Sequence, residues 1–161
     1  MNIKKSGFTL TELLAVVLII GILTAMIMPQ YKRTIRRAEA VESLVNLRSL
    51  YDAAKRYKSA TSSTPTSLKG LDVEFFDAKN ISGDFQKFQI GKYSYEFKSS
   101  CDNSKPCIES CRLNTNDFCF QFYYNHTGLG KDTLLCSPNT ATGTWICNSM
   151  GTASGSYYVI E

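Results

Sequence analysis

The chain opens with a short polar segment that leads into a long, uninterrupted apolar stretch. Residues 8–28 contain one charged side chain, Glu12, among mainly aliphatic residues. Folded as an α-helix, a segment of this length is about 30 Å long, which matches the hydrocarbon core of a bilayer. The pattern therefore predicts a membrane-spanning helix near the N-terminus.

A helical pattern continues beyond the membrane segment, but the face that carries the apolar side chains changes. Residues 31–59 contain neither Gly nor Pro. At helical spacing, a first stripe is formed by Tyr31, Ile35, Ala38, Val41 and Val45, and a second stripe by Leu44, Leu47, Leu50, Tyr51, Ala54 and Tyr57. A helix that packs on a single core keeps one stripe. We therefore predict that the first stripe meets neighbouring helices in an assembly and that the second packs under the chain's own sheet; one uneven stripe is the alternative.

The remainder of the chain has the pattern of a β-rich head. Aromatic and polar side chains alternate at 93–97, and 118–124 is rich in aromatic residues, so both are predicted strands. Residues 125–131 are a predicted turn. Shorter strands are expected at 133–136, 144–147 and 157–160. Phenylalanines expected in the core are Phe75, Phe76, Phe85 and Phe88. A helix followed by consecutive strands indicates an α+β fold with an antiparallel sheet.

All six cysteines lie in this head: Cys101, Cys107, Cys111, Cys119, Cys136 and Cys147. Their density without a C-x-x-C motif is typical of a disulfide-stabilised domain rather than a zinc site. Three disulfides would form in an oxidising compartment. Six cysteines allow about 15 pairings, and the spacing alone leaves them open.

Charge and composition give little support to other functions. Eighteen Lys and Arg residues against fourteen Asp and Glu residues give a formal charge of +4, which is too mild to indicate specific nucleic-acid binding. The one histidine, His126, falls in the predicted turn, and no base is placed to activate a nucleophile. We therefore expect no enzyme activity, no metal and no cofactor.

Two familiar kinds of apolar N-terminal segment fit poorly. A secretory signal peptide carries a small-residue cleavage site after its apolar region, and residues 24–29 contain none. A plain membrane anchor leaves Glu12 unexplained, because a charge inside a membrane costs about 2.5–3.5 kcal/mol.

Gly7 is followed by Phe8 and Glu12, and then by an aliphatic helix that ends near Pro29. This arrangement resembles the N-terminus of type IV prepilins and type II secretion pseudopilins. The resemblance is close over residues 4–31 and extends to the rest only in layout. It implies a filament subunit whose leader is cut between Gly7 and Phe8, after which Phe8 is N-methylated. Glu12 would pair with the N-terminal amine of a neighbouring subunit and set the register of assembly. Pro29 is expected to kink or locally melt the helix.

The resemblance also implies how the chain is divided and where it works. Residues 1–7 would be the leader, 8–30 the transmembrane and assembly helix, 31–60 an amphipathic continuation, and 61–161 the disulfide-rich head. The partners would be identical or homologous pilin subunits, a prepilin peptidase and methylase, an inner-membrane assembly platform and membrane lipid, with no specific nucleic acid. The chain would cross a bacterial inner membrane once, with a periplasmic head, before entering a pilus or pseudopilus.

Within the head, the pair Cys136–Cys147 is the best single disulfide candidate. It would close a Pro-, Asn-, Thr- and Gly-rich loop between two predicted strands, and it resembles the pair that links the C-terminal loop in many pilins. The pairing of the other four cysteines stays open.

Several alternatives remain at this point. The sequence does not separate a pilus from a type II secretion pseudopilus, and a membrane-anchored periplasmic binding module that never polymerises is a further candidate. An anchored enzyme is the weakest. A simple count of basic residues also disagrees with a periplasmic head, because Lys32, Arg33, Arg36 and Arg37 outnumber the two lysines before the apolar segment.

Overall fold

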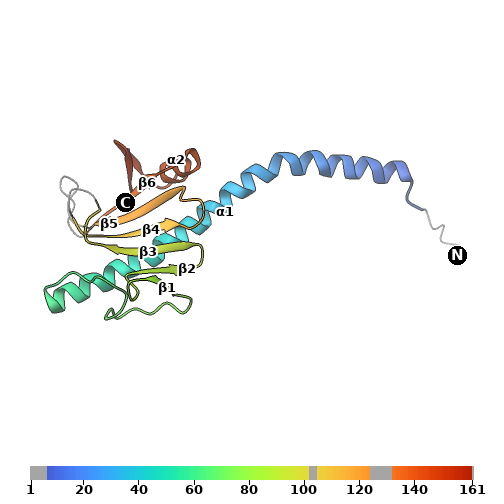
Figure 1. The fold of residues 1–161 in the computed structure, drawn as a ribbon. Coiled ribbons are helices and arrows are strands. Elements are labelled where there is room, and N and C mark those ends of the chain that lie inside the picture. Colours follow the sequence, from blue (N-terminus) through green and yellow to red (C-terminus); the bar gives the residue numbers. More distant parts are fainter. Residues whose placement is uncertain (1–6, 102–104, 124–131, 161) are drawn as a thin grey trace. The chain divides into compact units, whose positions relative to one another are not determined.

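The computed structural model describes residues 7–101, 105–123 and 132–160, which form two compact units, Met1–Ala38 and Glu39–Glu161. One helix, α1 (Leu10–Thr61), contributes to both units (Figure 1). The helix ends where Ser62 takes a left-handed φ of 58° and its N–H donates to the Lys58 carbonyl oxygen at 2.8 Å. This is a standard way to satisfy the last carbonyls of a helix.

In the first unit, residues 10–28 of α1 are mainly apolar, and none of them is buried by the rest of the described chain. The large hydrophobic side chains from Phe8 to Met28 are 44–78% exposed. The helix is long and apolar enough to cross a membrane, as judged from length and composition. Pro29 lies inside α1, which continues on both sides of it.

The second unit contains one antiparallel sheet of eight strands in the order β1-β2-β3-β4-β5-β6-β8-β7. A second helix, α2 (Ala141–Asn148), lies between β6 and β7 in the sequence. The strands are β1 (Lys79–Ser82), β2 (Lys87–Ile90), β3 (Tyr93–Lys98), β4 (Cys107–Arg112), β5 (Phe118–Tyr123), β6 (Thr133–Pro138), β7 (Thr152–Ser154) and β8 (Tyr157–Ile160). The predicted pilin-like α+β architecture, a long apolar helix followed by an antiparallel head with disulfides, is confirmed.

The core of the head lies between α1 and one face of the sheet, as the second stripe predicts. Leu47 and Leu50 are fully buried, and Tyr51 stacks on Phe122 with ring centroids 3.8 Å apart. Burial of each large apolar side chain contributes about 1.5–3 kcal/mol. In the same stretch of α1, the first-stripe residues Val41 and Val45 are 46% and 58% exposed. The prediction of two stripes with different surroundings is therefore confirmed for the head's own contacts.

Most of the predicted strands are confirmed, but the one expected at 144–147 is wrong, because these residues belong to α2. Thr140 caps that helix: its hydroxyl oxygen accepts a hydrogen bond from the Gly143 N–H at 3.2 Å. A short apolar run is compatible with a strand or a helix, and here the cap at Thr140 favours the helix. The sequence pattern also fails to predict β1, β2, β4 and β7. In β4 the reason is that Glu109 and Ser110 are buried, so apolar and polar residues do not alternate.

The phenylalanines expected in the core differ in their burial. Phe88 is fully buried, and Phe75 and Phe85 are partly buried against the core. Phe76 is fully exposed, so its assignment to the core is wrong. It lies in an irregular segment, where no periodicity of the sequence separates inward from outward positions.

The described cysteines form three disulfides, Cys101–Cys107, Cys111–Cys119 and Cys136–Cys147. The second joins paired residues of β4 and β5, and the third joins β6 to α2. The third is the pair singled out in the sequence, although it links a strand to a helix rather than two strands. Closing such a short loop stabilises a fold by about 2–4 kcal/mol.

Replacing Gly143 with Ala should destabilise the head. A Cβ at this position would lie 1.9 Å from the Asp117 carbonyl oxygen, so the backbone must move. We expect the free energy of unfolding to fall by about 1–3 kcal/mol, the usual cost of overpacking a buried site. Chemical unfolding without reductant measures this. Thr144→Ala, an exposed change in the same helix, is the matched control, and equal stabilities of the two variants would contradict the prediction.

Candidate functional site

The first turn of α1 holds Glu12 in a reciprocal cap with Thr9. The Glu12 Oε2 accepts from the Thr9 backbone N–H at 2.9 Å and from the Thr9 hydroxyl at 2.6 Å. In return, the Glu12 N–H donates to the Thr9 hydroxyl oxygen at 3.3 Å. This is a capping box, and the acidic residue also suits the positive end of the helix dipole. Thr followed three residues later by Glu is the sequence signature of this motif, but here the apolar run that follows drew the prediction of a membrane helix instead.

The cap explains why the carboxylate is tolerated at the helix start but does not neutralise it. Both groups that donate to Glu12 in the structure belong to Thr9 and are uncharged. Among the described residues, no cation forms an ion pair with this carboxylate. A charge that keeps only neutral donors remains costly in an apolar environment. Glu12 is therefore available to a cation from outside the described chain.

Gly7 and Phe8 lie just before α1. A Cβ added to Gly7 would meet no atom within 4 Å, and the Phe8 side chain is largely exposed. The peptide bond between them is therefore not covered by the rest of the described chain. Lys4 and Lys5 lie outside the described residues.

Beyond this end, α1 presents an apolar surface that the described chain does not cover. No residue in the most hydrophobic stretch of the helix is buried. Residues of the first stripe are exposed in each unit: Tyr31 and Ile35 in the first, and Val41 and Val45 in the second. Such a surface requires lipid or another protein segment to cover it.

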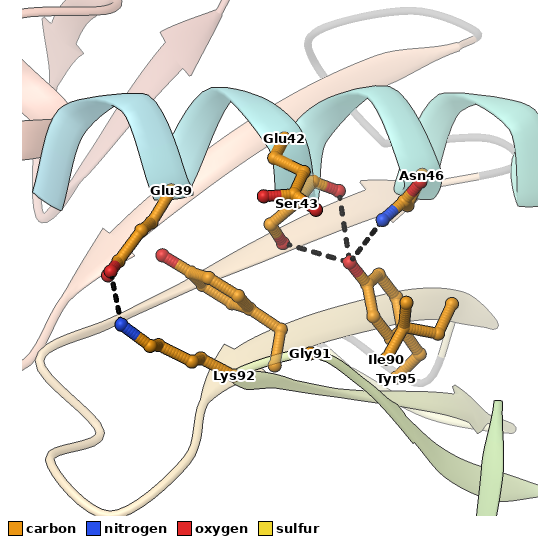
Figure 2. A pocket seen from close by; sticks show the side chains of 9 residues that line it. Glu39, Glu42, Ser43, Asn46, Ile90, Gly91, Lys92 and Tyr95 are labelled. Atoms are coloured by element: carbon orange, nitrogen blue, oxygen red, sulfur yellow. Dashed lines mark hydrogen bonds and ion pairs between the residues drawn. The ribbon is translucent and has the colours of Figure 1, made fainter. Parts of the chain in front are cut away.

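The head contains a cavity of about 280 Å³ beside α1 and the turn between β2 and β3. Figure 2 shows Glu39, Glu42, Ser43 and Asn46 coming from the helix, with Lys92 on the opposite side. The cavity was not predicted from the sequence, because its walls are about 50 residues apart along the chain. The lining residues are Glu39, Glu42, Ser43, Asn46, Ile90, Gly91, Lys92, Tyr93 and Tyr95.

Ion pairs and hydrogen bonds fix the walls of this cavity. The Glu39 carboxylate binds the Lys92 ammonium at 2.5 Å and the Arg112 guanidinium at 3.0 Å. Burial alone would raise the pKa of Glu39, but these two cations outweigh it and lower the pKa below its ordinary value. The Tyr95 hydroxyl lies 3.4 Å from both the Ser43 hydroxyl and the Asn46 amide, and burial raises its pKa.

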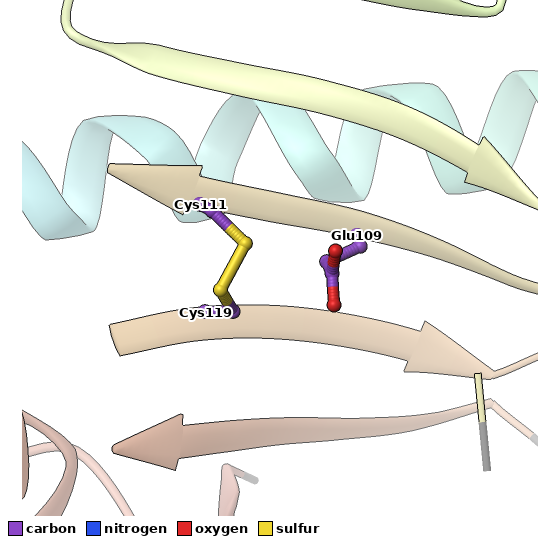
Figure 3. A group of neighbouring side chains, drawn as sticks. All are labelled: Glu109, Cys111 and Cys119. Atoms are coloured by element: carbon purple, nitrogen blue, oxygen red, sulfur yellow. A yellow bond between two sulfur atoms is a disulfide. The ribbon is translucent and has the colours of Figure 1, made fainter. Parts of the chain in front are cut away.

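A second group, Glu109 with Cys111 and Cys119, has the composition of a metal site but not its chemistry (Figure 3). The two sulfur atoms form a disulfide, so neither offers a thiolate. The Glu109 carboxylate forms an ion pair with Lys98 and accepts from the Gln121 amide at 2.8 Å. His126 lies outside the described residues.

Comparison with known proteins finds one family motif at the N-terminus and several distant relatives. The prokaryotic N-terminal methylation motif matches residues 2–28. A fimbrial protein of Dichelobacter nodosus is 38% identical over 106 residues, 65% of this chain and 60% of that protein. Type II secretion system core protein G of Aeromonas hydrophila is 32% identical over 70 residues, 44% of this chain and 49% of that protein. Type IV major pilin protein PilA of Myxococcus xanthus is 43% identical over 58 residues, 36% of this chain and 26% of that protein.

The chain thus spans no more than 60% of the length of these relatives. No solved structure matches it significantly. The comparisons establish the N-terminal methylation motif and a distant homology to type IV pilins and to type II secretion system core protein G.

The ion pairs of Glu39 should make the stability of the head depend on pH. A carboxylate whose pKa is lowered by folding stabilises the fold above its unfolded pKa, about 4.5. This stabilisation is lost as the pH falls through the lower folded value. We expect the Glu39→Gln variant to be less stable than the wild type by about 1–3 kcal/mol at neutral pH, with the difference shrinking below about pH 4.5. Urea unfolding from pH 7 to pH 3 measures both, with the exposed change Glu74→Gln as control. A constant difference across this range would contradict the assignment.

Proposed function

We propose that this chain, a distant homologue of type IV pilins and type II secretion pseudopilins, is a structural subunit that polymerises through α1 into a type IV pilus or pilus-like filament. The observation that carries the proposal is the exposed apolar helix with one uncompensated carboxylate at its start. A membrane anchor needs the apolar surface but not the carboxylate, whereas a filament of packed helices uses both.

Maturation supplies the cation that Glu12 lacks. In this proposal a prepilin peptidase cuts between Gly7 and Phe8, and the new N-terminal amine of Phe8 is methylated. The methylation motif over residues 2–28 supports this step, as does the uncovered glycine before the helix. A methylated amine stays protonated, so it can form an ion pair with the Glu12 carboxylate of a neighbouring copy.

The ion pair would set register more than it would add stability. A correctly placed neighbour neutralises both charges within an apolar bundle. A neighbour shifted along the helix leaves one charge bare there, which costs several kcal/mol. The first stripe would meet neighbouring helices beyond this point, because Val41 and Val45 stay exposed after the head has folded.

The proposed division of the chain follows from these roles: leader 1–7, assembly helix 8–30, amphipathic continuation 31–60 and head 61–161. The head would lie in the periplasm of a bacterium, where three disulfides are stable. The partners would be other pilin subunits, the peptidase and methylase, an inner-membrane assembly platform and, before assembly, membrane lipid.

The second candidate is the short pseudopilus of a type II secretion system. It is favoured by the matches to core protein G, which cover 44% of the chain. Both candidates use the same helix and the same cleavage, so they differ in the assembly that the subunit joins.

Glu12→Ala should leave membrane insertion intact and lower filament yield about tenfold or more, because misaligned and aligned neighbours would no longer differ by several kcal/mol. Membrane fractionation measures insertion, and sedimentation of sheared filaments measures yield. The matched control is Thr9→Ala, which breaks the cap at a cost of about 1 kcal/mol but keeps the carboxylate. If Glu12 acts only as a cap, the two variants will assemble equally well; normal incorporation of Glu12→Ala would sink the proposal.

A further inference from the structure

We infer that the Glu109 carboxylate protects the Cys111–Cys119 disulfide against reduction by thiols. This role belongs to the head alone and does not depend on filament assembly. The proposed function leaves the carboxylate without a role, although a charge is costly to keep in the interior of a protein. Its position beside the sulfur atoms supplies one.

Glu109 and the disulfide lie on the same face of the sheet. In the ladder between β4 and β5, Cys111 is paired with Cys119, and Glu109 is paired with Gln121. Residues two apart in a strand point to the same side, so the carboxylate is the neighbour of the disulfide along the ladder. One carboxylate oxygen and the two sulfur atoms lie within 4.8 Å of one another, and Figure 3 shows the Glu109 side chain beside the sulfur–sulfur bond.

The carboxylate is held in this place by groups on both neighbouring strands. Its oxygens bind the Lys98 ammonium of β3 and the Gln121 amide of β5, the latter at 2.8 Å. The Tyr123 hydroxyl in turn donates to the Gln121 amide oxygen at 3.0 Å. Lys98 is the more exposed member of the ion pair, with 33% of its side chain accessible against 11% for Glu109. Solvent therefore screens the cation more than it screens the carboxylate.

Reduction of this disulfide creates a new negative charge beside the carboxylate. An external thiolate attacks one sulfur atom, forms a mixed disulfide with it and expels the other sulfur as a thiolate. Cys119 is 7% exposed and Cys111 is the more accessible of the two, so the attack falls on the Cys111 sulfur. The electron pair of the broken bond goes to the Cys119 sulfur, which later takes a proton from water. A second external thiolate completes the reduction by attacking the first reductant's sulfur, which releases Cys111.

The carboxylate opposes the step in which the thiolate leaves. The Cys119 thiolate would form within 4.8 Å of the Glu109 carboxylate, and both residues are largely out of water. Two like charges at this separation repel each other strongly where the effective dielectric constant is low. Because the oxidised disulfide is neutral, the repulsion arises only as the bond breaks. It therefore raises the barrier to reduction and slows the reaction.

The protected bond closes the connection between β4 and β5, which holds other parts of the head. Within this connection, Asn114 and Asn116 have left-handed φ values of 68° and 45°, a conformation that few residues other than glycine adopt. The Asp117 carbonyl oxygen accepts from the N–H groups of Asn139 and Thr140 at 2.8 and 3.2 Å. Thr140 is the cap of α2. Loss of the disulfide would therefore loosen the start of α2 as well as the two strands.

Reduction kinetics of the full-length, oxidised protein in detergent test this role. We expect Glu109→Gln to be reduced at Cys111–Cys119 about tenfold faster than the wild type, because the leaving thiolate no longer meets a carboxylate. The probe is 2-mercaptoethanol at about pH 8, where thiolate is present. Samples are quenched with acid, alkylated and digested, and peptide mass spectrometry follows each disulfide separately. General opening of the head is reported in the same sample by the other two disulfides, Cys101–Cys107 and Cys136–Cys147.

Lys98→Gln separates an electrostatic role from a structural one. Removing the cation leaves the carboxylate uncompensated, so this variant should be reduced at Cys111–Cys119 about threefold more slowly than the wild type. A variant that only weakened the fold would be reduced faster. The matched control is Glu96→Gln, because Glu96 lies opposite Glu109 on β3 and has its own ion pair with Lys87 at 3.1 Å. We expect the rate of this control to stay within about twofold of the wild type.

Three results would overturn the inference: an unchanged rate for Glu109→Gln, an equal acceleration of all three disulfides in that variant, or faster reduction of Lys98→Gln at this bond. None of these measurements uses filaments, so each of them leaves the proposed assembly untouched.

Discussion

One requirement of this molecule is not met within the described chain: the apolar first part of α1 has nothing to cover it. Each Å² of such surface costs about 25 cal/mol in water, so the helix must lie in lipid or against other helices. Lipid satisfies the aliphatic side chains but leaves the Glu12 carboxylate with only the neutral donors of Thr9. In the proposed filament a neighbour's amine would satisfy that carboxylate as well. Because only the filament would compensate the Glu12 charge, the proposed transfer of the helix from the bilayer to the filament would be favourable.

The second part of α1, from Glu39 onward, packs against the sheet and forms part of the core of the head. Leu47, Leu50 and Tyr51 close one face of the sheet, while the opposite side of the helix keeps Val41 and Val45 exposed. On the same helix, Glu39 forms ion pairs with Lys92 and Arg112.

The parts of the fold that could be predicted are those in which periodicity is strong. The aliphatic run after Phe8, the change of stripe along α1 and the aromatic strands β3 and β5 all follow from spacing. The sequence at 144–147 fits a strand as well as it fits a helix, and only the cap at Thr140 decides for the helix. Strand β4 was not predicted because it contains the buried Glu109, whose charge is compensated by an ion pair with Lys98. The cavity could not be predicted from the sequence, because Glu39 and Lys92 are far apart along the chain and come together only when it folds.

The most direct test of the central claim is the intact mass and N-terminal sequence of the protein purified from its own membrane. We predict a chain that begins at an N-methylated Phe8, because only cleavage after Gly7 creates the amine that Glu12 is proposed to bind in a neighbouring copy. A chain that still begins at Met1 would contradict it. The long helix would then be an uncut anchor, and a periplasmic binding module would become the better description of the head.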